Sequence, residues 1–186
     1  MSMRVLVATV VAAVAVVAAG CGGSNDSSSS SSATPTDQWA DGLCSSITTW
    51  TSSLTSIVSS LKSGGLSKDS LTSAVDDAKT ATDTFTSSLK DLGKPDTGAG
   101  QQAKDSVDQL STEIDADMKK IEDTVSNASG AAGILAAVPV ITSTLQSAGT
   151  QVKSTISSLQ ALDAKGELES AFKQSSSCKT LTSSSG

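Results

Sequence analysis

The sequence predicts an all-α protein, an up-down-up-down four-helix bundle with a short extra helix at its C-terminal end. Along the body of the chain, apolar residues recur at alternating intervals of three and four, which is the period of one helix face. The β-branched residues follow the same period rather than strict alternation, so strands are not expected. Four such segments are separated by breaks that contain Gly or Pro. Because their apolar faces can be buried only against one another, we expect a bundle.

The first expected helix runs from about residue 36 to the pair Gly64-Gly65, which favours a tight turn. Thr36 or Asp37 is expected to cap its start, since both side chains can accept a bond from a free backbone N–H. Its apolar face comprises Leu43, Ile47, Trp50, Leu54, Ile57 and Leu61.

The second and third helices have clear boundaries. Ser67 is the expected N-cap of the second, which stops before Gly93 and Pro95. The third runs over residues 98–127. The apolar face of the second helix is Leu71, Val75, Ala78, Thr82, Phe85, Leu89 and Leu92, and that of the third is Ala103, Val107, Leu110, Ile114, Met118, Ile121 and Val125.

The fourth segment, residues 131–163, is interrupted by Pro139, which predicts either a kink or a short helix followed by a longer one. After Gly166 a fifth, shorter helix leads toward Cys178. The expected apolar face of the fourth segment is Leu135, Val138, Ile141, Leu145, Val152, Ile156, Leu159 and Leu162.

Ahead of the bundle, residues 1–20 have the layout of a signal peptide: one basic residue, Arg4, and then an apolar run of Val and Ala that ends in small residues. The run is shorter than the roughly 20 residues that a bilayer span needs, so a permanent span is the weaker interpretation. Ala18-Ala19-Gly20-Cys21 resembles the lipobox of bacterial lipoproteins. That resemblance implies that Cys21 carries a diacylglycerol thioether; the alternative is a secretory signal that leaves Cys21 a free or paired thiol.

The resulting organisation is a lipidated Cys21 with a disordered Ser-rich tether over residues 21–35, a helical domain over 36–182 and a disordered tail over 183–186. Without the leader the chain has 12 basic and 19 acidic residues, a net charge of −7, and no Arg. Such a chain is a poor nucleic-acid binder and would be repelled by anionic lipid. We therefore expect membrane attachment through the lipid anchor, on the extracytoplasmic face of the cell membrane.

With Cys21 assigned to lipid, Cys44 and Cys178 remain as a pair in an exported chain, where a disulfide is the default expectation. The chain has no His and no CxxC, so neither a zinc site nor a Cys/His catalytic pair is expected. Serine is abundant, but no base is present to activate it. We expect no catalytic residues and no cofactor.

Two further sets of residues have alternative interpretations. The third-helix acids Glu113, Asp115, Asp117, Glu122 and Asp123 could bind a cation, but Lys119 and Lys120 lie within a turn of them, which favours a solvated, ion-paired face. Trp39 and Trp50 could form an aromatic binding site, but in a chain with only two Phe they are the largest side chains available for the core, and we expect them there.

The segment Trp39-Ala40-Asp41-Gly42-Leu43-Cys44, with Glu167-Leu168, Ala171-Phe172 and Cys178 near the end, resembles a loose group of uncharacterised exported helical lipoproteins of actinobacteria. The resemblance implies an envelope location and a Cys-Cys staple, and it carries no activity. The expected function is therefore binding or interaction in the envelope, through an envelope protein or ligand. The alternative is a carrier of a small apolar or lipidic ligand in the bundle core, for which a large internal cavity would be needed.

Overall fold

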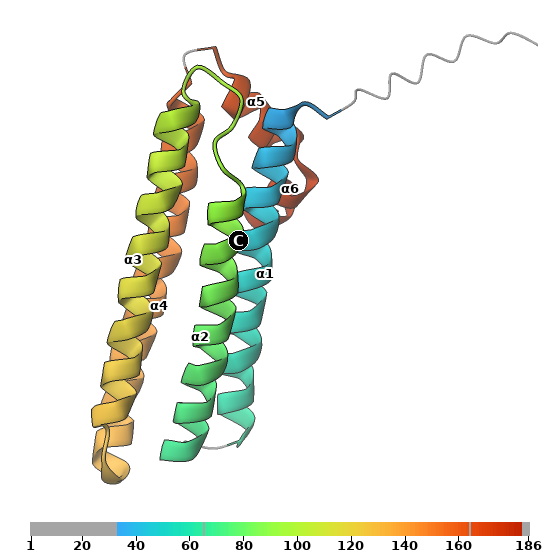
Figure 1. The fold of residues 1–186 in the computed structure, drawn as a ribbon. Coiled ribbons are helices and arrows are strands. Elements are labelled where there is room, and N and C mark those ends of the chain that lie inside the picture. Colours follow the sequence, from blue (N-terminus) through green and yellow to red (C-terminus); the bar gives the residue numbers. More distant parts are fainter. Residues whose placement is uncertain (1–32, 65, 164, 184–186) are drawn as a thin grey trace, which may run out of the picture. The chain divides into compact units, whose positions relative to one another are not determined.

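The computed structural model describes residues 33–64, 66–163 and 165–183, and the regular secondary structure of these residues is entirely helical. The predicted all-α class is confirmed. Six helices follow one another in this part of the chain (Figure 1): α1 (Pro35–Gly64), α2 (Lys68–Asp91), α3 (Gly100–Asn127), α4 (Gly130–Ala161), α5 (Glu167–Gln174) and α6 (Ser176–Ser183). The predicted leader, the lipidation site Cys21 and most of the tether lie outside the described residues.

Local sequence explains most of the helix ends. Ser67 caps α2 as predicted: its hydroxyl accepts from the backbone N–H of Ser70, whose own hydroxyl accepts from the N–H of Ser67. The predicted cap of α1 is wrong. Thr34, not Thr36 or Asp37, takes this place, because its hydroxyl accepts from the N–H of Asp37 while that carboxylate accepts from the N–H of Thr34. Pro35 then occupies the first helical position, where its missing N–H is no loss.

The C-terminal part of the chain differs from the single short helix that we expected. It forms two helices, α5 and α6, which are separated at Ser175. Asp163 caps α5, since its Oδ2 accepts from the N–H of Glu167 at 2.9 Å and of Leu168 at 3.3 Å. Hydrogen bonds from backbone N–H groups, with that of Lys165 the largest contribution, lower the pKa of Asp163.

Packing follows the order of the chain. α1 contacts α2, α2 contacts α3, and α3 contacts α4, while α5 and α6 both pack against α1 (Figure 1). The main core cluster contains buried residues from all six helices, among them Leu43, Leu89, Leu110, Leu159, Phe172 and Cys178. A second cluster, built around Leu71, Met118, Ile121 and Val125, joins α2 and α3. Every residue of the predicted α1, α2 and α3 faces is buried or half-buried.

The predicted face of α4 is partly wrong. Leu135 is 64% exposed, and the buried positions are Ala137, Thr144, Ala148, Val152 and Leu159. The chain stays in one helix through Pro139, so the alternative of two separate helices is also wrong.

By length and composition α4 is the one helix among the described residues that could cross a membrane, and only 17% of its most apolar 18-residue stretch is buried.

Candidate functional site

A disulfide joins Cys44 of α1 to Cys178 of α6, which confirms the predicted pairing. The two Cα atoms lie 5.0 Å apart, and both side chains are buried. The bond closes a sequence separation of 134 residues. It therefore holds the last helix of the described chain against the first.

Asp41, one turn before Cys44, reinforces this contact. Its Oδ1 accepts from the hydroxyl of Ser175 at 2.7 Å and from the backbone N–H of Ser177 at 3.2 Å. The hydroxyl of Ser175 in turn accepts from the N–H of Cys178. The bond from Ser175, followed by that from Ser177, lowers the pKa of Asp41 below its usual value. The N-terminus of α6 is thus capped by its own serine and by a carboxylate of α1.

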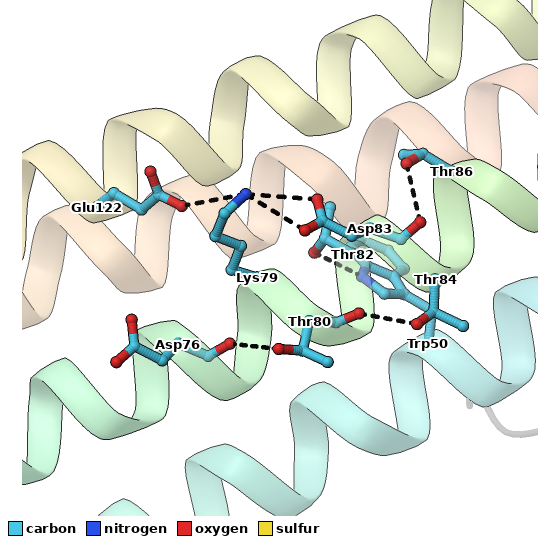
Figure 2. A network of polar contacts seen from close by, with 9 residues as sticks. All are labelled: Trp50, Asp76, Lys79, Thr80, Thr82, Asp83, Thr84, Thr86 and Glu122. Carbon is cyan, nitrogen blue, oxygen red and sulfur yellow. Dashed lines mark hydrogen bonds and ion pairs between the residues drawn. The ribbon is translucent and has the colours of Figure 1, made fainter.

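A surface groove of about 860 Å³ lies between α1 and α2. Its floor is the stacked pair Trp50 and Phe85, whose ring centroids lie 4.8 Å apart at an interplanar angle of 13°. The two residues are 5% and 2% exposed, so only a small part of each faces the groove. Trp50 also donates from Nε1 to the buried hydroxyl of Thr82, at 3.1 Å (Figure 2).

Both tryptophans belong to the core, as expected. Trp39 packs edge-to-face on Phe172 with a centroid distance of 6.3 Å, and its Nε1 donates to the carbonyl of Gly93 at 3.2 Å. Trp50 is a core residue that also lines the α1–α2 groove.

The walls of this groove carry ten Ser and Thr side chains and a single charged residue, Asp77. Several of the hydroxyls donate back to their own helix: Thr80 to the carbonyl of Asp76, Thr84 to that of Thr80, and Ser53 to that of Thr49. Figure 2 shows the first two of these bonds along α2. These hydroxyl donors are consequently used within the helices, and at these positions the groove presents hydroxyl oxygens, as acceptors, beside aliphatic and aromatic carbon.

On its other side α2 meets α3 through charged residues. Lys79 Nζ lies 3.3 Å from Asp83 on its own helix and 3.9 Å from Glu122 of α3 (Figure 2). All three side chains are exposed or nearly so, so the pairs contribute little to stability, in the range of about 0–1 kcal/mol each. They form a charged seam between α2 and α3, in contrast to the groove, whose lining has Asp77 as its single charged residue.

The five acids considered as a cation site do not converge. Glu113 lines a hollow between α3 and α4, Asp115 and Glu122 line one between α2 and α3, Asp123 lines a third on α3 itself, and Asp117 lines none of the three. Within the part of the chain that the structure describes, no group of three or more His, Cys, Asp or Glu residues could hold a metal ion. The expected pairing with Lys119 and Lys120 is replaced, for Glu122, by the contact with Lys79.

The α1–α2 groove was not apparent from the sequence. The only indication in the sequence is that Ser and Thr flank the apolar faces of both helices. The same residues are expected on an ordinary solvated helix surface, so they do not predict a groove. Comparison of the chain with protein-family models, with curated proteins and with solved structures finds no match.

Proposed function

We propose that this protein is a lipid-anchored, extracytoplasmic helical-bundle protein that acts by binding in the cell envelope and has no catalytic activity. The observation that carries the proposal is the α1–α2 groove, which is large, open and almost uncharged. A groove of about 860 Å³ lies within the usual size range of binding sites for small molecules and peptides.

The proposed arrangement of the four long helices is up-down-up-down. It is supported by the contacts between consecutive helices and by their short connections. In such a bundle α1 and α2 are antiparallel neighbours, and small side chains at their outer edge leave a groove along the seam. The short helices α5 and α6 would close one end of the bundle through the Cys44–Cys178 bond.

Catalysis is disfavoured by the chemistry of the groove. A nucleophilic serine needs a base within hydrogen-bond reach, and the chain has no His. Asp77 is the only titratable residue on the groove wall, and most hydroxyls with assigned bonds donate to their own helix. The groove offers surface and acceptors, which serve binding.

The carrier alternative has less support. The apolar faces of α1, α2 and α3 are filled by mutual packing in two core clusters. The α1–α2 groove opens at the surface, and its walls are mainly Ser and Thr rather than the apolar residues of these faces. A ligand of this protein is therefore more simply accommodated on the surface than in the core.

Two measurements test the proposal. Cys21→Ser should release the protein from the membrane fraction or leave it unprocessed, and an unmodified mature N-terminus by mass spectrometry would contradict the anchor.

For the groove, a photo-crosslinking amino acid at Ser52 should give a discrete adduct in intact cells, which Thr84→Trp should abolish by filling the groove. Ser157, which is exposed on α4, provides both controls. The crosslinker placed at Ser157 is the control for its placement at Ser52. The substitution Ser157→Trp is the control for Thr84→Trp. Equal adducts at both positions would contradict a specific role of the groove.

A further inference from the structure

The first half of α4 carries an apolar stripe that is largely open to solvent. Its residues recur at intervals of four and three along the chain and therefore share one side of the helix: Ala131, Leu135, Val138, Thr142 and Leu145. Leu135 is 64% exposed, Ala131 and Thr142 are also exposed, and the other two are half-buried. The hydroxyl of Thr142 donates to the carbonyl of Val138, so its hydrogen is used within the helix. The stripe consequently offers a partner mainly aliphatic carbon.

The neighbouring helices leave this stripe open. Ser147 and Gln151 line the hollow toward α3, and the helical period places them on the opposite side of α4 from the stripe. Both α1 and α4 reach the second core cluster, yet they are not among the helix pairs of the described residues that pack closely. α5 and α6 pack on α1, where Cys178 meets Cys44, but no residue of the following stretch 51–61 is fully buried. These parts of α1 and α4 form a half-covered face beside that cluster.

We call this surface, residues 51–61 and 130–152, the α1–α4 face, and it differs in charge from the rest of the chain. α1 has no Asp, Glu, Lys or Arg over residues 42–61, and α4 has none over 130–152. Most charged side chains of the four long helices lie on α2 and α3, where Lys79 meets Asp83 and Glu122. Because the chain has a net charge of −6, two copies repel each other when their charged surfaces meet. A second copy that approaches the α1–α4 face escapes this repulsion.

We propose that the α1–α4 face binds a second copy of this chain, with the two α4 stripes packed against each other in a symmetric contact. A patch that pairs with its own copy gives a closed two-fold dimer, the commonest symmetry of oligomers. The uncharged length of α4 is about 35 Å, and with the roughly 20 Å width of two helices the face covers about 700 Å². A standard interface buries about 800 Å² on each partner, so this area suffices for a reversible dimer. Thr142, near the middle of that length, lies closest to the two-fold axis.

A lipid surface suits the face less well. Helices that lie in a membrane interface usually carry Lys or Arg beside their apolar side, and the uncharged spans of α1 and α4 contain neither. The dimer contact goes beyond the proposed binding function. It requires neither the lipid anchor nor the α1–α2 groove, which lies on another side of α1.

The test is thiol crosslinking of the full chain in intact cells. Thr142→Cys places a thiol in the stripe, and a short bismaleimide should join two copies into an adduct that mass spectrometry identifies as a dimer of this chain. Ser147→Cys is the matched control, because Ser147 is exposed on the opposite side of the same helix, and its dimer adduct should be several-fold weaker. Both adducts are measured against the chain without an added cysteine.

A second pair of variants separates a specific contact from chance collision. Leu135→Glu should weaken the Thr142→Cys adduct by about fivefold or more, because each added charge loses water against the other copy. Leu135 is exposed in the single chain, so the fold should persist, which circular dichroism verifies. Ser147→Glu adds the same charge outside the stripe and should change the adduct less than about twofold. Thr84→Trp, which fills the α1–α2 groove, should leave the adduct unchanged, so the dimer and the proposed groove function can fail separately.

Several results would overturn the dimer. Equal adducts at positions 142 and 147, or an adduct that survives Leu135→Glu, would show that copies meet only by collision. An adduct of Thr142→Cys with a different protein would assign the face to that partner. A Cys at position 142 that forms no dimer and is shielded from a water-soluble maleimide would assign the face to lipid. Free labelling of that Cys without a dimer would show that the face stays in water.

Discussion

The disulfide between Cys44 and Cys178 provides the sharpest test of how this domain is stabilised. Reducing it frees a loop that spans 134 residues. In the chain-entropy account, closing a loop of this length stabilises the folded state by about 5 kcal/mol. That amount is comparable to the lower end of the 5–15 kcal/mol that is typical of whole domains. For a domain of this size each kcal/mol shifts the melting temperature by about 2–4 °C, so reduction should lower it by roughly 10–20 °C.

The chain-entropy value is an upper limit for the effect of reduction, because other contacts also hold α6 in place. The bonds from Ser175 and Ser177 to Asp41, and the packing of Leu181 on the main core, persist without the covalent bond. The assay is thermal unfolding followed by circular dichroism, with and without reductant. The double variant Cys44→Ala/Cys178→Ala is the control, since reductant should leave its melting temperature unchanged. A difference below about 3 °C between oxidised and reduced wild type would refute the clamp.

Two further predictions concern Asp41 and the face of α4. Asp41→Asn should lower the free energy of unfolding by about 1 kcal/mol at neutral pH in urea titrations, because the N-terminus of α6 loses its charged acceptor. Since hydrogen bonds from Ser175 and Ser177 hold the folded-state pKa of Asp41 below its usual 3.8, this stabilisation is complete above that value and is lost as the pH falls through the folded-state pKa. Wild type and variant should therefore converge in acid, and a constant gap would contradict the assignment. Leu135→Ala should change stability by less than about 0.5 kcal/mol, whereas Leu159→Ala should cost about 2–5 kcal/mol, and equal effects in the same titrations would show that α4 buries its originally expected face.

Large apolar side chains at intervals of three and four made α1, α2 and α3 predictable. Leu43, Ile47 and Trp50 in α1, or Val107, Leu110 and Ile114 in α3, stand among polar neighbours, so only one face of each helix can be buried. The disulfide was predictable for a different reason: once Cys21 is assigned to lipid, as we propose, Cys44 and Cys178 are the single pair that remains.

The first half of α4 lacks such contrast. Apolar residues occupy every side of the helix between Gly130 and Ile141, so the period does not determine which side is buried. The positions that the structure buries, Ala137, Thr144 and Ala148, are small and were outweighed in the sequence by Leu135. The α1–α2 groove and the α3–α4 hollow were beyond sequence analysis for a related reason. Each is formed by short side chains of two helices, and the register between two helices is not contained in the period of either one.

The Ser and Thr residues that dominate the exposed faces have a consequence for binding. On α1, Thr48 donates to the carbonyl of Cys44 and Thr55 to that of Thr51, and on α2, Ser88 donates to that of Thr84. A hydroxyl that bonds to its own helix turns its hydrogen inward and leaves the threonine methyl or the serine β-carbon toward solvent. The α1–α2 groove is therefore less polar than its Ser and Thr content suggests. A partner that lies there meets aliphatic and aromatic carbon together with hydroxyl acceptors, so an uncharged helix face that carries a few donors suits the groove better than a highly charged ligand.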